Sequence, residues 1–220
     1  MFHKRLIGYF RNHDKVDTLC FFSLLAVSAQ AQTSFLDGQK IIPQLQAQLK
    51  QNRIRLKAMC FNGHSVACKE MYIRSFKYDS QMEVWVRNNN NEPFKLFKTY
   101  KVCALAGTLG PKRMEGDFQV PEGFYYITEF NPKSDYHLSL KLNYPNQSDK
   151  LLSDTYKPGG GIYIHGSCVT VGCIPINDQQ IEELYILAAS AKNSGQDFIP
   201  VHIFPVRYNK PESVEYLTKL

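Results

Sequence analysis

The informative part of this chain reads Ile162-Tyr163-Ile164-His165-Gly166-Ser167-Cys168-Val169-Thr170-Val171-Gly172-Cys173-Ile174. The apolar run before His165 is typical of a strand, and Gly159-Gly160-Gly161 breaks the chain just ahead of it. We therefore expect His165 to end one strand and Cys173 to start the next segment after a short loop. That arrangement brings an imidazole within hydrogen-bond reach of a thiol.

These residue types suit nucleophilic catalysis. A thiolate is the working nucleophile of a cysteine enzyme, and a neighbouring imidazole can take its proton. We expect Cys173 to be the nucleophile and His165 the general base. Gly172 keeps side-chain bulk away from the sulfur. The backbone N–H groups of Gly172 and Cys173 are predicted to face the carbonyl oxygen that becomes anionic.

Other roles are open for the same residues. His165, Cys168 and Cys173 could bind zinc, with a fourth ligand drawn from His64, Cys60 or Cys68. Cys168 and Cys173 could form a disulfide across a small loop, or Cys173 could be a plain core cysteine. We expect no metal and no cofactor.

The rest of the chain predicts a mostly β fold. Residues 82–86 alternate apolar and polar side chains, 88–91 read as a turn, and Phe94 to Cys103 is the returning strand of a hairpin, with Cys103 buried in it. Further strands are expected at 124–130, 138–142 and 201–206, and 120–123 is a second turn. Asn177 or Asp178 caps a helix that runs to about Lys192. Its buried stripe is expected at Ile181, Leu184, Tyr185 and Ala188.

The beginning of the chain predicts export. Basic residues precede an apolar run from Leu19 to Val27, and Ala29-Gln30-Ala31 is a small-x-small cleavage pattern. We expect residues 1–31 to be a signal peptide, with an uncleaved anchor as the alternative and the only membrane contact. Residues 32–68 are predicted to hold a lead-in helix at 33–58 that packs on the main domain.

Cysteine counts and charge bear on the compartment and the partners. Removal of residues 1–31 takes away Cys20 and leaves five cysteines, so at least one thiol is unpaired or intermolecular. Cys60 and Cys68 flank a short loop and form one candidate pair. The net charge of +6 comes from scattered Lys and Arg residues, which argues against a nucleic-acid partner.

The chain resembles the YkuD-type L,D-transpeptidases. Their signature is a His-Gly pair followed by Ser/Thr-x-Gly-Cys, here His165-Gly166 and then Thr170-Val171-Gly172-Cys173. The upstream blocks resemble most closely the YafK-like branch. They are Phe97-Lys98-Thr99-Tyr100, Leu109-Gly110-Pro111-Lys112, Glu115-Gly116-Asp117, Pro121-Glu122-Gly123-Phe124 and His137-Leu138-Ser139-Leu140.

The resemblance implies a fold, a reaction and partners. It implies a β-sandwich or barrel-like catalytic domain over residues 69–207, leaving 208–220 as a C-terminal tail. Cys173 would attack the carbonyl at the L-centre of diaminopimelate in a peptidoglycan stem peptide, and an amine or water would resolve the acyl-enzyme. The backbone carbonyl of Gly166 would orient the ring of His165. The implied location is the periplasm or cell envelope, and a wall-linked lipoprotein is a further possible substrate.

Two departures from the larger branch affect substrate binding. Only Ser167, Cys168 and Val169 separate His-Gly from Ser/Thr-x-Gly-Cys, and Pro175 stands where an Arg usually follows Cys and Ile. A missing guanidinium removes a bidentate grip on a carboxylate. Lys112, Arg113 and Lys133 are candidate replacements, and Thr170 and His137 are further candidate substrate contacts. The rival to an enzyme is a wall-binding module with an inactive site.

Overall fold

The computed structural model describes Phe35 and residues 69–219. The predicted signal segment, the lead-in helix at 33–58 apart from Phe35, and the candidate pair Cys60 and Cys68 lie outside these described residues. Within them, no helix is long and apolar enough to cross a membrane.

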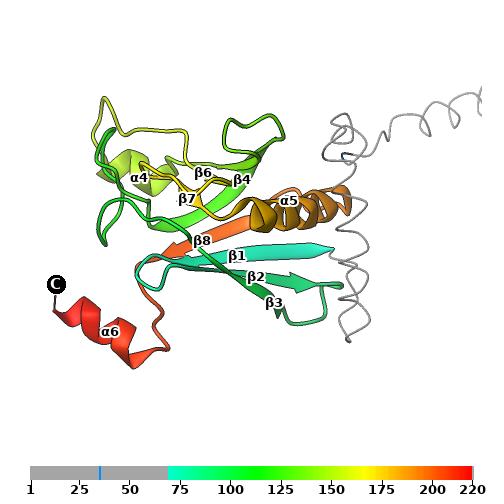
Figure 1. The fold of residues 1–220 in the computed structure, drawn as a ribbon. Helices are drawn as coiled ribbons and strands as arrows, with labels where there is room; N and C mark the ends of the chain where they lie inside the picture. The colour runs from blue at the N-terminus through cyan, green and yellow to red at the C-terminus, as the bar shows by residue number, and fades with distance from the viewer. Residues whose placement is uncertain (1–34, 36–68, 220) are drawn as a thin grey trace, which may run out of the picture.

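The described part of the chain is built on one eight-stranded sheet, in the order β3-β2-β1-β8-β4-β5-β6-β7. The strands are β1 (Glu70–Phe76), β2 (Gln81–Arg87), β3 (Lys95–Lys101), β4 (Gly123–Asn131), β5 (Ser139–Leu142), β6 (Tyr163–His165), β7 (Ile174–Pro175) and β8 (Pro200–Phe204). The β1–β8 and β6–β7 pairs are parallel, and the other neighbours are antiparallel. The predicted mostly β, barrel-like fold is confirmed as a curled half-barrel (Figure 1).

Alternation of side chains places the core on the concave face of the sheet. In β1 and β2, Met71, Ile73, Met82 and Val84 are fully buried, while the residues between them point to the other face. Helix α5 (Asp178–Asn193) packs into the curl and contacts β1, β5 and β6 (Figure 1). The predicted stripe of α5 is buried throughout, and Asn177 caps it as expected, in a capping box with Gln180.

Two short helices were not predicted. Helix α4 (Gln147–Leu152) is capped by Asn146, whose side chain accepts from the Asp149 N–H in a capping box. Helix α6 (Pro211–Thr218) lies in the segment expected to be a tail. It is attached by a stack of Tyr216 on Tyr78, with ring centroids 4.3 Å apart, and by the Ser213 hydroxyl donating to Asp79. Both helices bury little apolar surface, which explains why their sequence pattern is weak.

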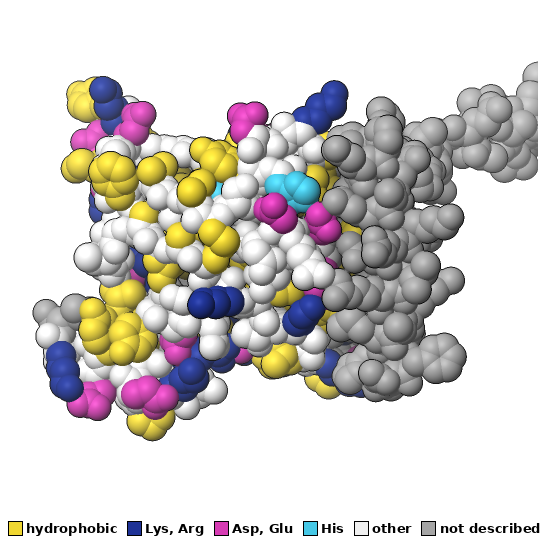
Figure 2. Space-filling model, in the orientation of Figure 1, with side chains coloured by type: hydrophobic (Ala, Val, Ile, Leu, Met, Phe, Trp, Pro, Cys, Tyr) yellow, Lys and Arg dark blue, Asp and Glu magenta, His cyan; other side chains and the backbone are white. Residues whose placement is uncertain are grey.

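Apolar side chains gather on the surface at the α4 end of the molecule (Figure 2). Leu151, Leu152 and Tyr156 are all largely exposed there. The chain continues from this surface into Gly159-Gly160-Gly161, which form one wall of the pocket described below.

Candidate active site

His165 ends β6 and is held from both sides. It pairs with Ser139 of β5 and with Pro175 of β7, and its carbonyl accepts from the Ile176 N–H at 2.9 Å. Its side chain is buried. The ring Nδ1 lies 2.5 Å from the carbonyl oxygen of Gly166. Because a carbonyl only accepts, Nδ1 carries the hydrogen and Nε2 of the neutral ring is left as the acceptor.

Burial sets the charge of this imidazole. It lowers the pKa of His165, and the bond to the Gly166 carbonyl offsets only part of that effect. The ring is therefore neutral at neutral pH, as a general base must be. The contact expected from Gly166 is present, and its catalytic role stays a prediction.

Gly166 is required by close packing. A Cβ at this position would lie 2.7 Å from Asp178 Oδ1 and 2.9 Å from the Tyr136 carbonyl oxygen. The same carboxylate oxygen of Asp178 accepts from the Ser167 N–H at 2.8 Å. The loop after His165 is thus fixed directly against the first turn of α5.

Cys173 lies immediately before β7, beside β6. Ile164 pairs with Ile174 in parallel register, so Cys173 and His165 lie on the same face of the two adjoining strands. The Cys173 thiol is half-buried and donates to the Gly161 carbonyl oxygen, with a sulfur–oxygen distance of 3.6 Å. Burial raises the pKa of Cys173, while a backbone hydrogen bond at Tyr163 and the charge of Lys112 lower it in part. The resting pair is a neutral thiol and a neutral imidazole.

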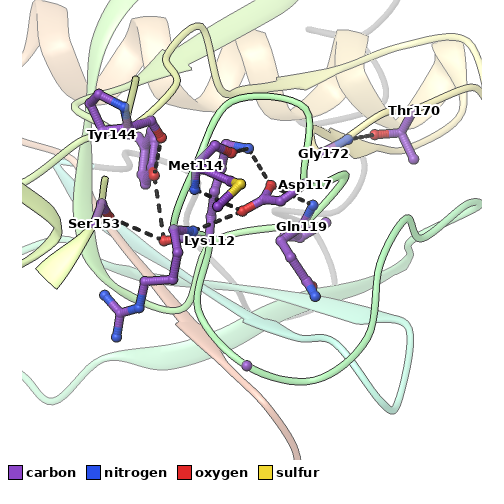
Figure 3. Close-up of polar contacts among 12 residues, drawn as sticks. Lys112, Met114, Asp117, Gln119, Tyr144, Ser153, Thr170 and Gly172 are labelled. Carbon is purple, nitrogen blue, oxygen red and sulfur yellow. Dashed lines mark hydrogen bonds and ion pairs between the residues drawn. The ribbon is translucent and has the colours of Figure 1, made fainter. Parts of the chain in front are cut away.

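The turn before Cys173 is held by Thr170. Its hydroxyl donates to the Cys173 carbonyl oxygen at 2.8 Å. The same hydroxyl accepts from the Gly172 N–H at 3.0 Å (Figure 3). Gly172 has a φ of +139°, and a Cβ there would lie 3.1 Å from the Gln119 carbonyl oxygen. The Gly172 N–H is thus already bonded to Thr170 and would have to leave it to join the predicted oxyanion hole, whose Gly172 and Cys173 donors stay a prediction.

Cys168 forms a disulfide with Cys103, 65 residues earlier in the sequence. The expectation that Cys103 is a buried strand residue is wrong: β3 ends at Lys101, and Cys103 lies half-buried beyond it. The disulfide also rules out the alternative Cys168–Cys173 pair and removes Cys168 as a zinc ligand. Among the cysteines of residues 69–219, Cys173 is the free one.

A pocket of about 370 Å³ opens beside the Cys173 thiol. One wall is Gly159-Gly160-Gly161, and another is the segment from Lys112 to Phe118. The sequence marked the glycines only as a chain break and Glu115-Gly116-Asp117 only as a point of resemblance. Their position beside the thiol depends on the tertiary fold.

The other candidate substrate contacts are dispersed. Lys112 lines the pocket, whereas Arg113, Lys133, His137 and Thr170 are not among its lining residues. His137 lies ahead of β5 rather than in a strand, and its Nε2 is 2.7 Å from the Glu182 carboxylate of α5. The substrate roles of these residues stay predictions. No cluster of His, Cys, Asp or Glu suited to a metal ion occurs within the described residues.

Residues 73–203 match the YkuD family, described as the L,D-transpeptidase catalytic domain. The chain belongs to this family. The matched range runs from β1 to β8 and contains both His165 and Cys173.

Sequence similarity to individual relatives supports the YkuD assignment. Proteins of Escherichia coli K12 and O157:H7 called YafK, provisionally named as L,D-transpeptidases, are 34% identical over 139 residues, which is 62% of this chain and 54% of theirs. The chain therefore spans about half the length of these relatives. The predicted YafK-like branch is confirmed.

Two solved structures resemble the YkuD fold of this chain. The helical cell shape determining protein Pgp2 of Campylobacter jejuni is 24% identical with a TM-score of 0.49, covering 63% of this chain and 48% of its own. Bd1075 of Bdellovibrio bacteriovorus is 25% identical with a TM-score of 0.45, covering 71% of this chain and 57% of its own.

Proposed function

We propose that this protein is a cysteine L,D-transpeptidase of the cell wall, which forms an acyl-enzyme at the L-centre of diaminopimelate and passes the acyl group to an amine. The observation that carries the proposal is the arrangement at the β6–β7 edge. A free thiol faces a pocket, and a buried neutral imidazole on the adjoining strand has its Nδ1 held by the Gly166 carbonyl. This arrangement supports general-base activation of Cys173.

In the acylation step, His165 Nε2 accepts the thiol proton as the sulfur attacks the peptide carbonyl. The carbonyl oxygen becomes anionic and is stabilised by the Cys173 N–H. The carbon–nitrogen bond then breaks, the departing D-alanine amine takes the proton from His165, and a thioester remains. A second stem peptide's amine attacks this thioester and loses its proton to His165. The carbon–sulfur bond then breaks, and His165 passes the proton to the departing sulfur, which restores the thiol.

A hydrolytic outcome is the second candidate. Water in place of the amine would give an L,D-endopeptidase that cleaves cross-links or releases a wall-bound lipoprotein. Pro175, which follows Ile174 in β7, supports this candidate, since no guanidinium is supplied there to hold a second peptide. A non-catalytic wall-binding module is the rival of another class. All three functions place the protein in the periplasm or cell envelope.

Mass spectrometry of purified tetrapeptide muropeptides incubated with the protein tests these candidates. Cys173→Ala is the inactive control, and its far-UV circular dichroism should match that of the unchanged protein. Loss of D-alanine with cross-linked dimers supports transpeptidation, and loss without dimers supports hydrolysis. Full activity in Cys173→Ala would refute the role of Cys173. If no substrate reacts, including lipoprotein-linked wall, the binding module gains support.

A further inference from the structure

Lys112 lines the pocket, but its ammonium group is already paired with the carboxylate of Asp117. The side chain is only 6% exposed, and Nζ lies 2.5 Å from Asp117 Oδ1 and 2.8 Å from the Met114 carbonyl oxygen (Figure 3). Withdrawing Nζ to hold a substrate carboxylate would leave Asp117 without its cation, which is costly for a partly buried pair. Lys112 therefore acts on the pocket as one half of a neutral ion pair.

Asp117 makes the pocket wall a rigid turn. Its carboxylate also accepts from the N–H groups of Arg113, Met114 and Gln119, at 2.8 to 3.0 Å (Figure 3). Burial alone would raise the pKa of Asp117, but the bonds from Lys112 and these amides lower it to about 2. The carboxylate is therefore ionised at any physiological pH and holds the turn in place.

Glu115 stands at the tip of this turn. Its backbone N–H donates to the Lys157 carbonyl oxygen at 2.8 Å, which ties the tip to the segment that leads into Gly159-Gly160-Gly161 on the opposite wall. The Glu115 side chain is exposed and lines the pocket. Within residues 69–219, it takes part in no ion pair.

Among the charged side chains that line the pocket, Glu115 has no ionic partner in the part of the chain that the structure describes. Apart from Cys173, its ionisable lining residues are Lys112 and Glu115, and Lys112 is neutralised by Asp117. The remaining lining is glycine and apolar side chains. We propose that Glu115 is a specificity-determining residue, whose carboxylate binds a primary ammonium group of the peptide that Cys173 attacks. This inference rests on the proposed function, in which that peptide carries the free amine of the diaminopimelate D-centre.

Peptide binding can be measured without turnover. The receptor is the full chain with Cys173→Ala, with or without Glu115→Gln, a change that removes the charge and keeps the shape. The ligands are the tetrapeptide stem with a free D-centre amine and the same peptide with that amine acetylated. Glu212→Gln, on the exposed first turn of α6, is the matched control. Isothermal titration calorimetry gives each Kd.

With Glu115 present, acetylation should weaken binding by about 10-fold, the expected size of a charge-assisted hydrogen bond in a partly open site. With Glu115→Gln the two peptides should bind within about 2-fold of each other, and Glu212→Gln should keep the 10-fold preference. The proposal is overturned if Glu115→Gln prefers the free-amine peptide over the acetylated one as strongly as the receptor with Glu115 does. It is also overturned if neither peptide binds.

Turnover by the unchanged protein separates this proposal from the proposed function. A preference for the ammonium that depends on Glu115, without turnover of any wall substrate, would support the ammonium site and refute the enzyme. If the protein turns over a wall substrate and Glu115→Gln leaves KM unchanged, the enzyme is supported and the ammonium site is refuted.

Discussion

Cys168 is bonded to Cys103, so the loop between the proposed base and nucleophile is tied to the segment that follows β3. The Cys103 N–H also donates to the Pro175 carbonyl oxygen at 3.0 Å, next to His165 in the sheet. The disulfide thus joins the edge of the sheet that holds both candidate catalytic residues to a distant part of the chain.

Removing this disulfide should destabilise the protein. The bond closes a loop of 65 residues, and a loop of that size is worth about 4 kcal/mol through the entropy of the unfolded chain. We expect Cys103→Ser/Cys168→Ser to lower the free energy of unfolding in urea by about 2 to 4 kcal/mol. Cys173→Ala should change it by less than about 1 kcal/mol. Equal stability of the double variant and the unchanged protein would count against this bond.

The acid limb of the activity profile should lie below the ordinary range for histidine. Burial lowers the pKa of His165, so the ring stays neutral and able to accept a proton to a pH below about 6.5. As pH falls through that lowered pKa, the ring becomes protonated and kcat/KM should fall. His202, on a strand remote from β7 in the sheet, supplies the control: His202→Gln should leave the limb in place. An acid limb above pH 7 would contradict the neutral resting pair.

Asp117→Asn should loosen the pocket wall. It leaves the buried Lys112 ammonium without its carboxylate, at a cost of about 2 kcal/mol in the free energy of unfolding. Adding Lys112→Met should recover part of this loss, because the unpaired charge is then gone. If the double variant is less stable than Asp117→Asn alone, the ion pair is not what holds the turn.

The same carboxylate predicts a pH dependence of stability. Asp117 has a folded-state pKa of about 2, below the usual unfolded value near 3.9. The folded state therefore binds fewer protons between these values, and its contribution to stability is complete above pH 4 and lost as pH falls toward 2. In urea titrations, Asp117→Asn should flatten this part of the curve.

Two neighbouring glycines give a matched test of the opposite wall. Gly159 has a φ of +83°, and a Cβ there would lie 2.9 Å from Lys112 Cε, whereas a Cβ at Gly160 meets nothing within 4 Å. Gly159→Ala should cost about 1 to 2 kcal/mol of stability and lower kcat/KM, because the backbone is strained and the Lys112 side chain is displaced. Gly160→Ala should keep the stability of the unchanged protein, because its Cβ meets no neighbour.

Thr170 should act by positioning Cys173. Its hydroxyl joins the Gly172 N–H to the Cys173 carbonyl oxygen, so Thr170→Val removes both bonds. We expect kcat to fall about 10-fold with KM changed little, since the nucleophile is less well placed. Thr170→Ser keeps the hydroxyl and should retain most of the activity. A rise in KM alone would instead favour the predicted substrate contact.

Local sequence determined much of the fold and the reacting pair. The alternation in β2, the strands expected at 124–130 and 138–142, and the capped, striped α5 follow from residues next to one another in the chain. His165 and Cys173 were identifiable because the strand-loop-strand segment that joins them is short. In each case the physical rule acts over a few residues: the two-residue period of a strand, the turn of a helix, or the geometry of a cap.

Tertiary structure alone decided which distant groups meet. No local pattern indicates that Cys103 bonds to Cys168, that His137 faces Glu182, or that Glu115 and Gly159-Gly160-Gly161 line the pocket beside Cys173. The sequence suggested Lys112 as a cation that could hold substrate, but the fold buries it against Asp117. These contacts form only when the sheet curls and loops from separate strands converge, so the same side chain would have a different partner, and a different charge balance, in another fold.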